Sequence, residues 1–272
     1  MSSEKLQKVM ARAGLCSRRQ AETLIEAGRV SINGSIATLG ARVEPKDTIR
    51  VDGKILKILD EVPTRVIAYY KPDGEISTQN DPQGRPTVFE HLPSIKNGRW
   101  VQIGRLDINT QGLLLFTNDG EMANRLMHPS SEIEREYAVR VFGEVTDQML
   151  DQLKSGVALE DGVARFDVII DQGGEGINHW YHVILREGRQ REVRRLWESQ
   201  GVKVSRLIRV RYGTATLPRG LAQGRWIELT VDQINALRQS VDLPVLKSID
   251  KKSLGQRQPN ARRRIQNRVR RR

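Results

Sequence analysis

The first sixty residues carry the pattern of two short helices followed by hairpins. Ser17 and Gln20 have the spacing of a capping box at the start of the second helix. Asn33-Gly34, set between β-branched residues, is typical of a type I′ hairpin turn. In the first helix, apolar residues recur at i, i+3, i+4 and i+7 and share one face: Leu6, Val9, Met10 and Ala13. Residues 1–60 are therefore expected to form a small separate domain.

Residues 64–243 alternate short strand patterns with a few helix patterns. Period-2 or continuous apolar runs predict strands at 66–70, 101–103, 113–116, 137–142, 166–170, 180–185 and 226–229. Helical periodicity predicts helices at 120–127, 146–155, 190–200 and 231–239. This succession indicates an α+β domain with a mixed, mainly antiparallel sheet, because strands and helices do not alternate regularly.

Charge is distributed unevenly along the 272 residues. The formal net charge is +12, of which residues 1–60 carry +4, residues 61–242 carry −2 and residues 243–272 carry +10. The segment RQPNARRRIQNRVRRR at 257–272 is too polar to offset the entropy of folding. We therefore expect residues 244–272 to be a disordered basic tail that binds phosphates with strong salt dependence.

Several classes of protein are excluded by the sequence. No apolar run approaches the roughly 18–20 residues that span a bilayer, and the N-terminus has no signal-peptide core. Cys16 is the single cysteine, which rules out an internal disulfide and a cysteine-based zinc site. We expect a soluble cytoplasmic protein without a metal or organic cofactor.

Two residues stand out as candidates for chemistry. Asp107 lies in Gly-Arg-Leu-Asp between two apolar strands, where it is either a partly buried reactive carboxylate or a turn aspartate that caps backbone N–H groups. Tyr137 stands at the head of a strand, where tyrosines are usually core residues with a satisfied hydroxyl. Position alone leaves both interpretations open.

A concentrated basic stretch runs from residue 186 to 211, with nine basic side chains against three acidic ones. It predicts a groove for a phosphate backbone, with Trp197 and Tyr212 as stacking surfaces. The alternative is a set of surface arginines in salt bridges. Arg18 and Arg19 open the second N-terminal helix, and Lys5, Lys8 and Arg12 could join them on one RNA-binding surface or on a merely solvated face.

In this order the motifs resemble those of the bacterial ribosomal RNA pseudouridine synthases. The similarity extends over residues 6–237, and residues 1–60 resemble the alpha-L RNA-binding module of that family. Arg135 stands where the family usually has lysine, two residues before the active-site tyrosine. The matching segments are Lys71-Pro72-Asp73-Gly74, residues 104–107 with Thr110-x-Gly112, Tyr137, and residues 187–196.

The resemblance implies a role for each matching residue. Asp107 would be the catalytic nucleophile or base, with Arg194 as the basic partner that keeps it ionised. Tyr137 would stack on the target base and move a proton, and Val193 or Leu196 would pack against the base. Arg105 would occupy the gap left by the flipped nucleotide or hold its phosphate. The remaining RNA-binding candidates are Arg189, Arg191, Arg195, Arg18 and Arg19.

The implied function is site-specific isomerisation of a uridine to pseudouridine in 23S ribosomal RNA of the large subunit. Two alternatives remain open at this point: the same chemistry on small-subunit rRNA or tRNA, and a noncatalytic ribosome-assembly factor that uses the basic clusters alone. The expected partner is ribosomal RNA, free or in an assembling subunit, and the chain is expected to act as a monomer away from membranes.

Overall fold

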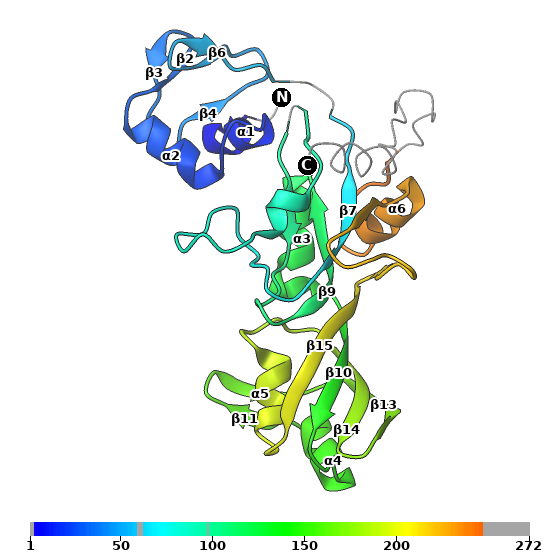
Figure 1. Ribbon diagram of the computed structural model, residues 1–272. Helices are drawn as coiled ribbons and strands as arrows, with labels where there is room; N and C mark the ends of the chain where they lie inside the picture. The colour runs from blue at the N-terminus through cyan, green and yellow to red at the C-terminus, as the bar shows by residue number, and fades with distance from the viewer. Residues whose placement is uncertain (1–2, 59–61, 97, 247–272) are drawn as a thin grey trace, which may run out of the picture.

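The N-terminal part of the computed structural model folds around a core of its own. The structure describes residues 3–58, 62–96 and 98–246 (Figure 1). We call residues 3–58 the N-terminal module and residues 62–246 the sheet domain. The elements of the module are β1 (Glu4–Lys5), α1 (Leu6–Arg12), α2 (Arg18–Glu26), β2 (Val30–Ile32), β3 (Ser35–Ile36), β4 (Arg42–Val43), β5 (Ile49–Val51) and β6 (Lys54–Ile55).

The local signals in the module are confirmed. The Ser17 side chain accepts from the Gln20 backbone and the Gln20 side chain accepts from the Ser17 backbone, so the capping box at α2 is complete. Asn33 and Gly34 both have positive φ, as a type I′ turn requires. Leu6, Met10 and Ala21 are fully buried between the two helices and the strand order β3-β2-β5-β6.

The sheet domain is built on a nine-stranded mixed sheet with the order β13-β14-β10-β15-β9-β7-β17, to which β16 and β8 add at β15 and β9. Only β15 and β9 pair in parallel, so the expectation of a mainly antiparallel α+β domain is confirmed. Its elements are β7 (Val66–Lys71), η1 (Val88–His91), β8 (Val101–Ile103), β9 (Gln111–Thr117), α3 (Gly120–Met127), η2 (Pro129–Ser131), β10 (Arg135–Phe142), α4 (Asp147–Ser155), β11 (Val157–Leu159), β12 (Gly162–Ala164), β13 (Val168–Glu175), β14 (Asn178–Leu185), α5 (Glu192–Glu198), β15 (Lys203–Tyr212), β16 (Ala215–Thr216), β17 (Trp226–Glu228) and α6 (Val231–Gln239).

The two faces of this sheet carry separate apolar cores. One core joins alternate residues of β7, β9, β10 and β14 to α4 and α5, including Leu114, Val139 and Leu196. The other lies under α3 and α6 on the opposite face of β7 and β9, and includes Leu115 and Leu237. In Figure 1, α6 lies beside β7 in the upper half of the sheet domain, and β13 and β14 lie in the lower half.

β15 was not among the predicted strands, although it is the longest in the sheet domain and pairs with both β10 and β9. Its polar positions are arginines, which made the segment look like a surface patch. Two bulges opposite β10 also interrupt its alternation of apolar and polar residues. The strand nevertheless has the composition of a strand, with Val204, Leu207, Ile208 and Val210.

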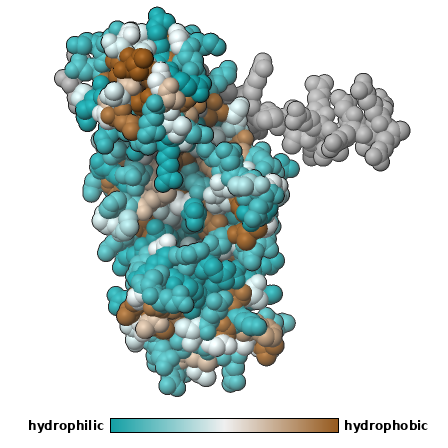
Figure 2. Space-filling model, turned by 90° about the vertical axis from the view of Figure 1, so that its left-hand side faces the viewer, coloured by the Kyte–Doolittle hydropathy of each residue, from teal (hydrophilic) through white to brown (hydrophobic). Residues whose placement is uncertain are grey.

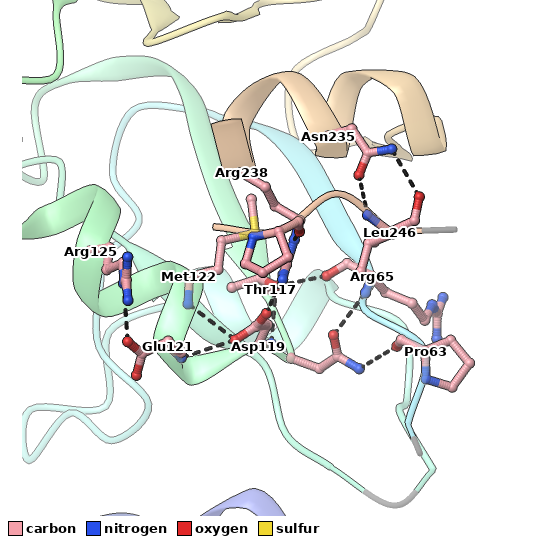
Figure 3. Close-up of polar contacts among 12 residues, drawn as sticks. Pro63, Arg65, Thr117, Asp119, Glu121, Met122, Arg125, Asn235, Arg238 and Leu246 are labelled. Carbon is pink, nitrogen blue, oxygen red and sulfur yellow. Dashed lines mark hydrogen bonds and ion pairs between the residues drawn. The ribbon is translucent and has the colours of Figure 1, made fainter. Parts of the chain in front are cut away.

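A polar network ties the two ends of the sheet domain together (Figure 3). The Asn118 side chain donates to the carbonyl of Pro63 and accepts from the backbone of Arg65. Asp119 caps α3 and accepts at 2.6 Å from Arg238 of α6, which in turn donates to the carbonyl of residue 244. Asn235 clamps the backbone of Leu246 through two hydrogen bonds.

The face of the molecule that Figure 2 shows is mainly hydrophilic. In Figure 2 hydrophobic residues gather on the N-terminal module and at scattered points of the sheet domain. The exposed large apolar residues of the module are Leu15, Ile36, Leu39 and Ile55. No helix in the described ranges is long and apolar enough to cross a membrane. Apart from residues 244–246, the predicted basic tail lies outside the described residues.

Candidate functional site

One row of residues crosses the centre of the sheet and forms the floor of the candidate site. In register, Lys71 of β7 lies opposite Gly112 of β9, Gly112 opposite Arg209 of β15, and Arg209 opposite Tyr137 of β10. Gly112 has a φ of +107°, and a Cβ there would collide with the backbone of Arg209. The row is therefore packed so closely that only glycine fits at its centre.

Lys71 anchors the loop that carries Asp107. Its side chain is fully buried, and the Nζ group donates to the carbonyls of Pro72, Ile108 and Thr110 at 2.9, 3.2 and 2.9 Å. Two of these carbonyls belong to the turn that follows Asp107, which the backbone bond from Thr110 to the carbonyl of Asp107 also closes. A buried ammonium thus holds the loop by three charged hydrogen bonds.

Arg194 holds the same loop from the other side. Arg191 takes a left-handed conformation immediately before α5, and Arg194 projects from that helix into the domain, 8% exposed. Its guanidinium donates to the carbonyl of Asn109 at 2.7 Å and to that of Val204 in β15 at 2.9 Å. The three consecutive carbonyls of residues 108–110 are therefore bound by two buried cations, Lys71 and Arg194.

The carboxylate of Asp107 is half-buried and forms no ion pair within 4 Å in the described part of the chain. Arg194, expected as its direct partner, contacts the loop backbone two residues further on instead. Asp107 still acts on both cations through its charge. Burial lowers the pKa of Lys71 to about 8, and burial together with the charge of Arg191 lowers the pKa of Arg194, while Asp107 opposes the shift in both.

The apolar candidates lie together in one cluster next to this loop. Leu106, which precedes Asp107, belongs to the same buried cluster as Tyr137, Val193 and Leu196. Tyr137 is 9% exposed and Val193 is 5% exposed. The Asp107 carboxylate thus follows directly on an apolar cluster that includes an aromatic ring, a surface that would suit a planar base removed from a stack.

Three exposed arginines, one near the site and two on the module, have no carboxylate partner among the described residues. Arg105 is exposed two residues before Asp107, and Arg18 and Arg19 are exposed at the start of α2. In contrast, Lys8 and Arg12, which were expected beside Arg18 and Arg19, both pair with Glu4. Arg105, Arg18 and Arg19 are therefore available to an anion.

The basic stretch 186–211 does not form one groove. Arg189 and Arg195 bind Asp161 and so hold the β11–β12 hairpin against α5. Arg191 pairs with Glu198 at 3.6 Å. Arg194 and Arg209 are buried inside the domain, and Arg186 and Arg211 pair with Glu134. The prediction of a single concentrated groove is therefore wrong.

The two aromatic residues predicted as stacking surfaces are fully buried, so that prediction is also wrong. Trp197 packs between Tyr181 and Phe166. The Tyr212 hydroxyl donates to the carbonyl of Leu126 at 2.8 Å. The Arg209 guanidinium lies over the Tyr212 ring. Both side chains stabilise the domain and are closed to RNA.

Three buried charged residues near the candidate site were missed or only partly recognised from the sequence. Lys71 was noted as part of a turn motif, without its role as an anchor. Arg209 is 1% exposed in the central row, where Nε donates to the carbonyl of Leu113. Glu192 is 3% exposed, burial raises its pKa, and it accepts from the Arg189 backbone at the start of α5. Burial of a charged side chain is the common property, and a pattern of charges along the chain does not reveal it.

A separate cavity of about 570 Å³ lies between the module and the sheet domain. Arg18, Arg99, Asp119 and Glu121 are among its lining residues, and Asp107 is not. Within the described residues no group of three or more His, Cys, Asp or Glu side chains could hold a metal ion. The chemistry of the candidate site therefore has to be derived from Asp107 and its neighbours.

Comparison with protein families gives two matches along the chain. Residues 65–199 match the RNA pseudouridylate synthase family, and residues 4–49 match the S4 domain. The first match covers the loop of Asp107, the strand of Tyr137 and the helix of Arg194.

Individual proteins match over most of the chain. The ribosomal large subunit pseudouridine synthase B of Escherichia coli (strain K12) is 63% identical over 246 residues, which cover 89% of this chain and 84% of that protein. The protein of the same name from Vibrio cholerae is 59% identical over 244 residues, 89% of this chain and 76% of that protein. A crystal structure of a pseudouridylate synthase superposes with a TM-score of 0.60 at 27% identity, covering 86% of this chain and 99% of that one.

Proposed function

Because the chain belongs to the RNA pseudouridylate synthase family, we propose that it isomerises one uridine of large-subunit 23S ribosomal RNA to pseudouridine, as a monomer in the cytoplasm. The reaction breaks the C1′–N1 bond, turns the base and joins C1′ to C5, while C5 loses its proton and N1 gains one. One observation carries the proposal. The carboxylate of Asp107 stands without an ion pair among the described residues, on a loop that two buried cations hold beside an apolar wall.

Each side chain then has a chemical task. Asp107 attacks the sugar or removes its proton as nucleophile or base, and Lys71 and Arg194 hold its loop in place through the carbonyls of residues 108–110. Tyr137 stacks on the flipped base and moves the proton at C5 or C2′, with Val193 and Leu196 behind it. Arg105 takes the place of the flipped nucleotide in the RNA or binds its phosphate.

Identity of about three-fifths with the large subunit synthases B supports the large-subunit target. RNA recognition would involve Arg18 and Arg19 of the S4-like module, and the basic tail would add sequence-independent attraction to phosphates. Arg189, Arg191 and Arg195 would act on RNA indirectly, since each already binds a carboxylate of the protein.

Asp107→Asn tests the catalytic assignment. Tritium at C5 of uridine is released when C1′ joins C5, so release from labelled large-subunit rRNA measures turnover directly. Asp107→Asn should bind RNA as the wild type does and release no tritium. The matched control is Asp73→Asn, which removes an exposed carboxylate from the neighbouring turn and should leave turnover intact. Substantial release by Asp107→Asn would remove Asp107 from the mechanism.

The substrate assignment is tested separately. In a strain that lacks the gene, pseudouridine mapping over all ribosomal and transfer RNAs should find one site missing, in large-subunit rRNA. A missing site in small-subunit rRNA or in tRNA would keep the chemistry and overturn the target. No missing site, together with no turnover in vitro, would favour a noncatalytic RNA-binding role.

A further inference from the structure

The sheet domain has a second surface with the composition of an RNA-binding face. It lies on the side of β10, β14 and β15 opposite to Tyr137. In register, Trp180, Arg140 and Arg206 form one row across the three strands, and Asn178, Phe142 and Lys203 form the next. We call these two rows the outer face. Val139 and Val141, which alternate with its residues, point into the core and are fully buried.

The outer face has no covering element among the described residues. α4 and α5 pack on the opposite side of these strands, and α3 and α6 pack on β7 and β9. Phe142 is 47% exposed, and Ile170 on the edge strand β13 is 45% exposed. Exposure of a large aromatic residue at the end of β10 and of a branched residue on the neighbouring edge strand is consistent with a surface that another molecule contacts.

The cations of this face form no ion pair with a carboxylate of the described residues. Arg140 and Arg206 lie directly opposite each other, an arrangement that destabilises a sheet unless an anion neutralises it. No carboxylate of the described residues lies within 4 Å of Arg140, Arg206 or Lys203, whereas Arg211 on the same strand is paired twice. These three cations are therefore available to an anion from outside the described residues.

The bulge at Ser205 orients one of these guanidinium groups. Arg140 Nε donates to Ser205 Oγ at 2.9 Å, and Ser205 Oγ donates back to the Arg140 carbonyl at 3.0 Å. The two terminal nitrogens of Arg140 make no hydrogen bond to other described residues. This fixed, planar group is suited to bidentate contact with a phosphate.

We propose that the outer face binds an unpaired segment of the RNA substrate, with Arg140, Arg206 and Lys203 on its phosphates and Trp180 and Phe142 stacked on its bases. Alternating cations and aromatic rings on an open sheet are the features that bind single-stranded nucleic acid without sequence preference. The inference rests on the proposed function in that the RNA is ribosomal. The face lies across the sheet from Asp107, so it contacts RNA away from the reacting uridine.

The charge contribution is tested with the full-length protein and a fluorescent oligouridylate of about 16 nucleotides. Lys203→Ala with Arg206→Ala removes two phosphate contacts, so the slope of log K against log salt should fall by about 1.4. Lys154→Ala with Arg219→Ala removes the same charge from exposed positions elsewhere and should leave the slope nearly unchanged. Equal slopes for the two double variants would overturn the proposal.

The stacking contribution is tested with Trp180→Leu, which keeps an apolar side chain. It should weaken oligouridylate binding about fivefold or more without a change of salt slope. Unchanged affinity would show that the face binds something other than RNA bases, such as a protein, and would overturn the proposal.

A failure of this inference is distinguishable from a failure of the proposed function. In tritium release, Lys203→Ala with Arg206→Ala should raise KM and leave kcat unchanged, because neither residue is near Asp107. If the wild type releases no tritium from ribosomal RNA, the proposed function fails, and the oligouridylate measurements still decide whether the outer face binds RNA.

Discussion

Replacing Lys71 with methionine removes the buried ammonium that holds the loop of Asp107. Three charged hydrogen bonds are lost, each worth about 1.5–3 kcal/mol, or roughly 4–9 kcal/mol together. Burying the charged ammonium opposes the stabilisation by these bonds. The pKa of Lys71, lowered from 10.5 to about 8, corresponds to a cost of about 3 kcal/mol for the charged form. The difference predicts a loss of about 3 kcal/mol in the free energy of unfolding.

The assay is thermal unfolding together with tritium release. A loss of about 3 kcal/mol lowers the Tm of a domain of this size by about 6–12 °C. The carbonyls of residues 108 and 110 also lose their donor, so Asp107 is less well placed and kcat should fall about 100-fold at a temperature where the variant is folded.

The control for Lys71→Met is Lys154→Met, which makes the same change on an exposed face of α4 and should alter neither quantity. A Lys71→Met protein with the Tm and kcat of the wild type would refute the anchoring role. A lowered Tm with unchanged kcat would restrict that role to stability.

Three further predictions concern the floor and the edge of the site. Tyr137→Phe should keep the Tm and lower kcat about 100-fold, which stopped-flow or tritium release can measure; an unchanged rate would limit the ring to packing. Gly112→Ala places a Cβ against the backbone of Arg209 at a φ of +107° and should cost more than about 3 kcal/mol by chemical unfolding; a wild-type midpoint would contradict the close approach. The Arg211 guanidinium lowers the pKa of Glu134 below its usual value of 4.5. The ion pair therefore stabilises the folded protein at neutral pH, and this contribution is lost as the pH falls below about 4.5 and Glu134 is protonated. The difference in Tm between wild type and Glu134→Gln should therefore shrink in acid, and a constant difference would refute the ion pair.

Elements with a local signal were predictable from the sequence. The helix at 120–127 has its aspartate cap and apolar face within one segment, and the structure begins and ends it at the predicted residues. The same holds for the capping box of α2 and the turn at Asn33-Gly34. In each case the residues that decide the structure are neighbours in the chain, so the sequence contains the whole interaction.

What depends on distant partners was not predictable. β15 was not predicted because its polar positions are arginines whose partners lie in other segments. Arg209 donates to a carbonyl of β9, and Arg211 pairs with Glu134 and Glu136. In the sequence, Trp197 looks like a surface residue because arginines precede it. In the structure, the ring of Tyr181 packs against it. At the candidate site, motif order pointed to Asp107 and Arg194, but only the fold reveals that Arg194 binds the carbonyl of Asn109.

The network of Asn118, Asp119 and Arg238 has a consequence for how this enzyme can be varied. Asn118 binds the carbonyl of Pro63, where the sheet domain begins. Its neighbour Asp119 binds Arg238, which in turn binds the carbonyl of residue 244 near the end of the domain. A domain whose ends meet tolerates circular permutation and exchange of the segments attached there. The segments attached at both ends can therefore be replaced, by evolution or by design, without moving the strands that carry Tyr137 or the loop that carries Asp107.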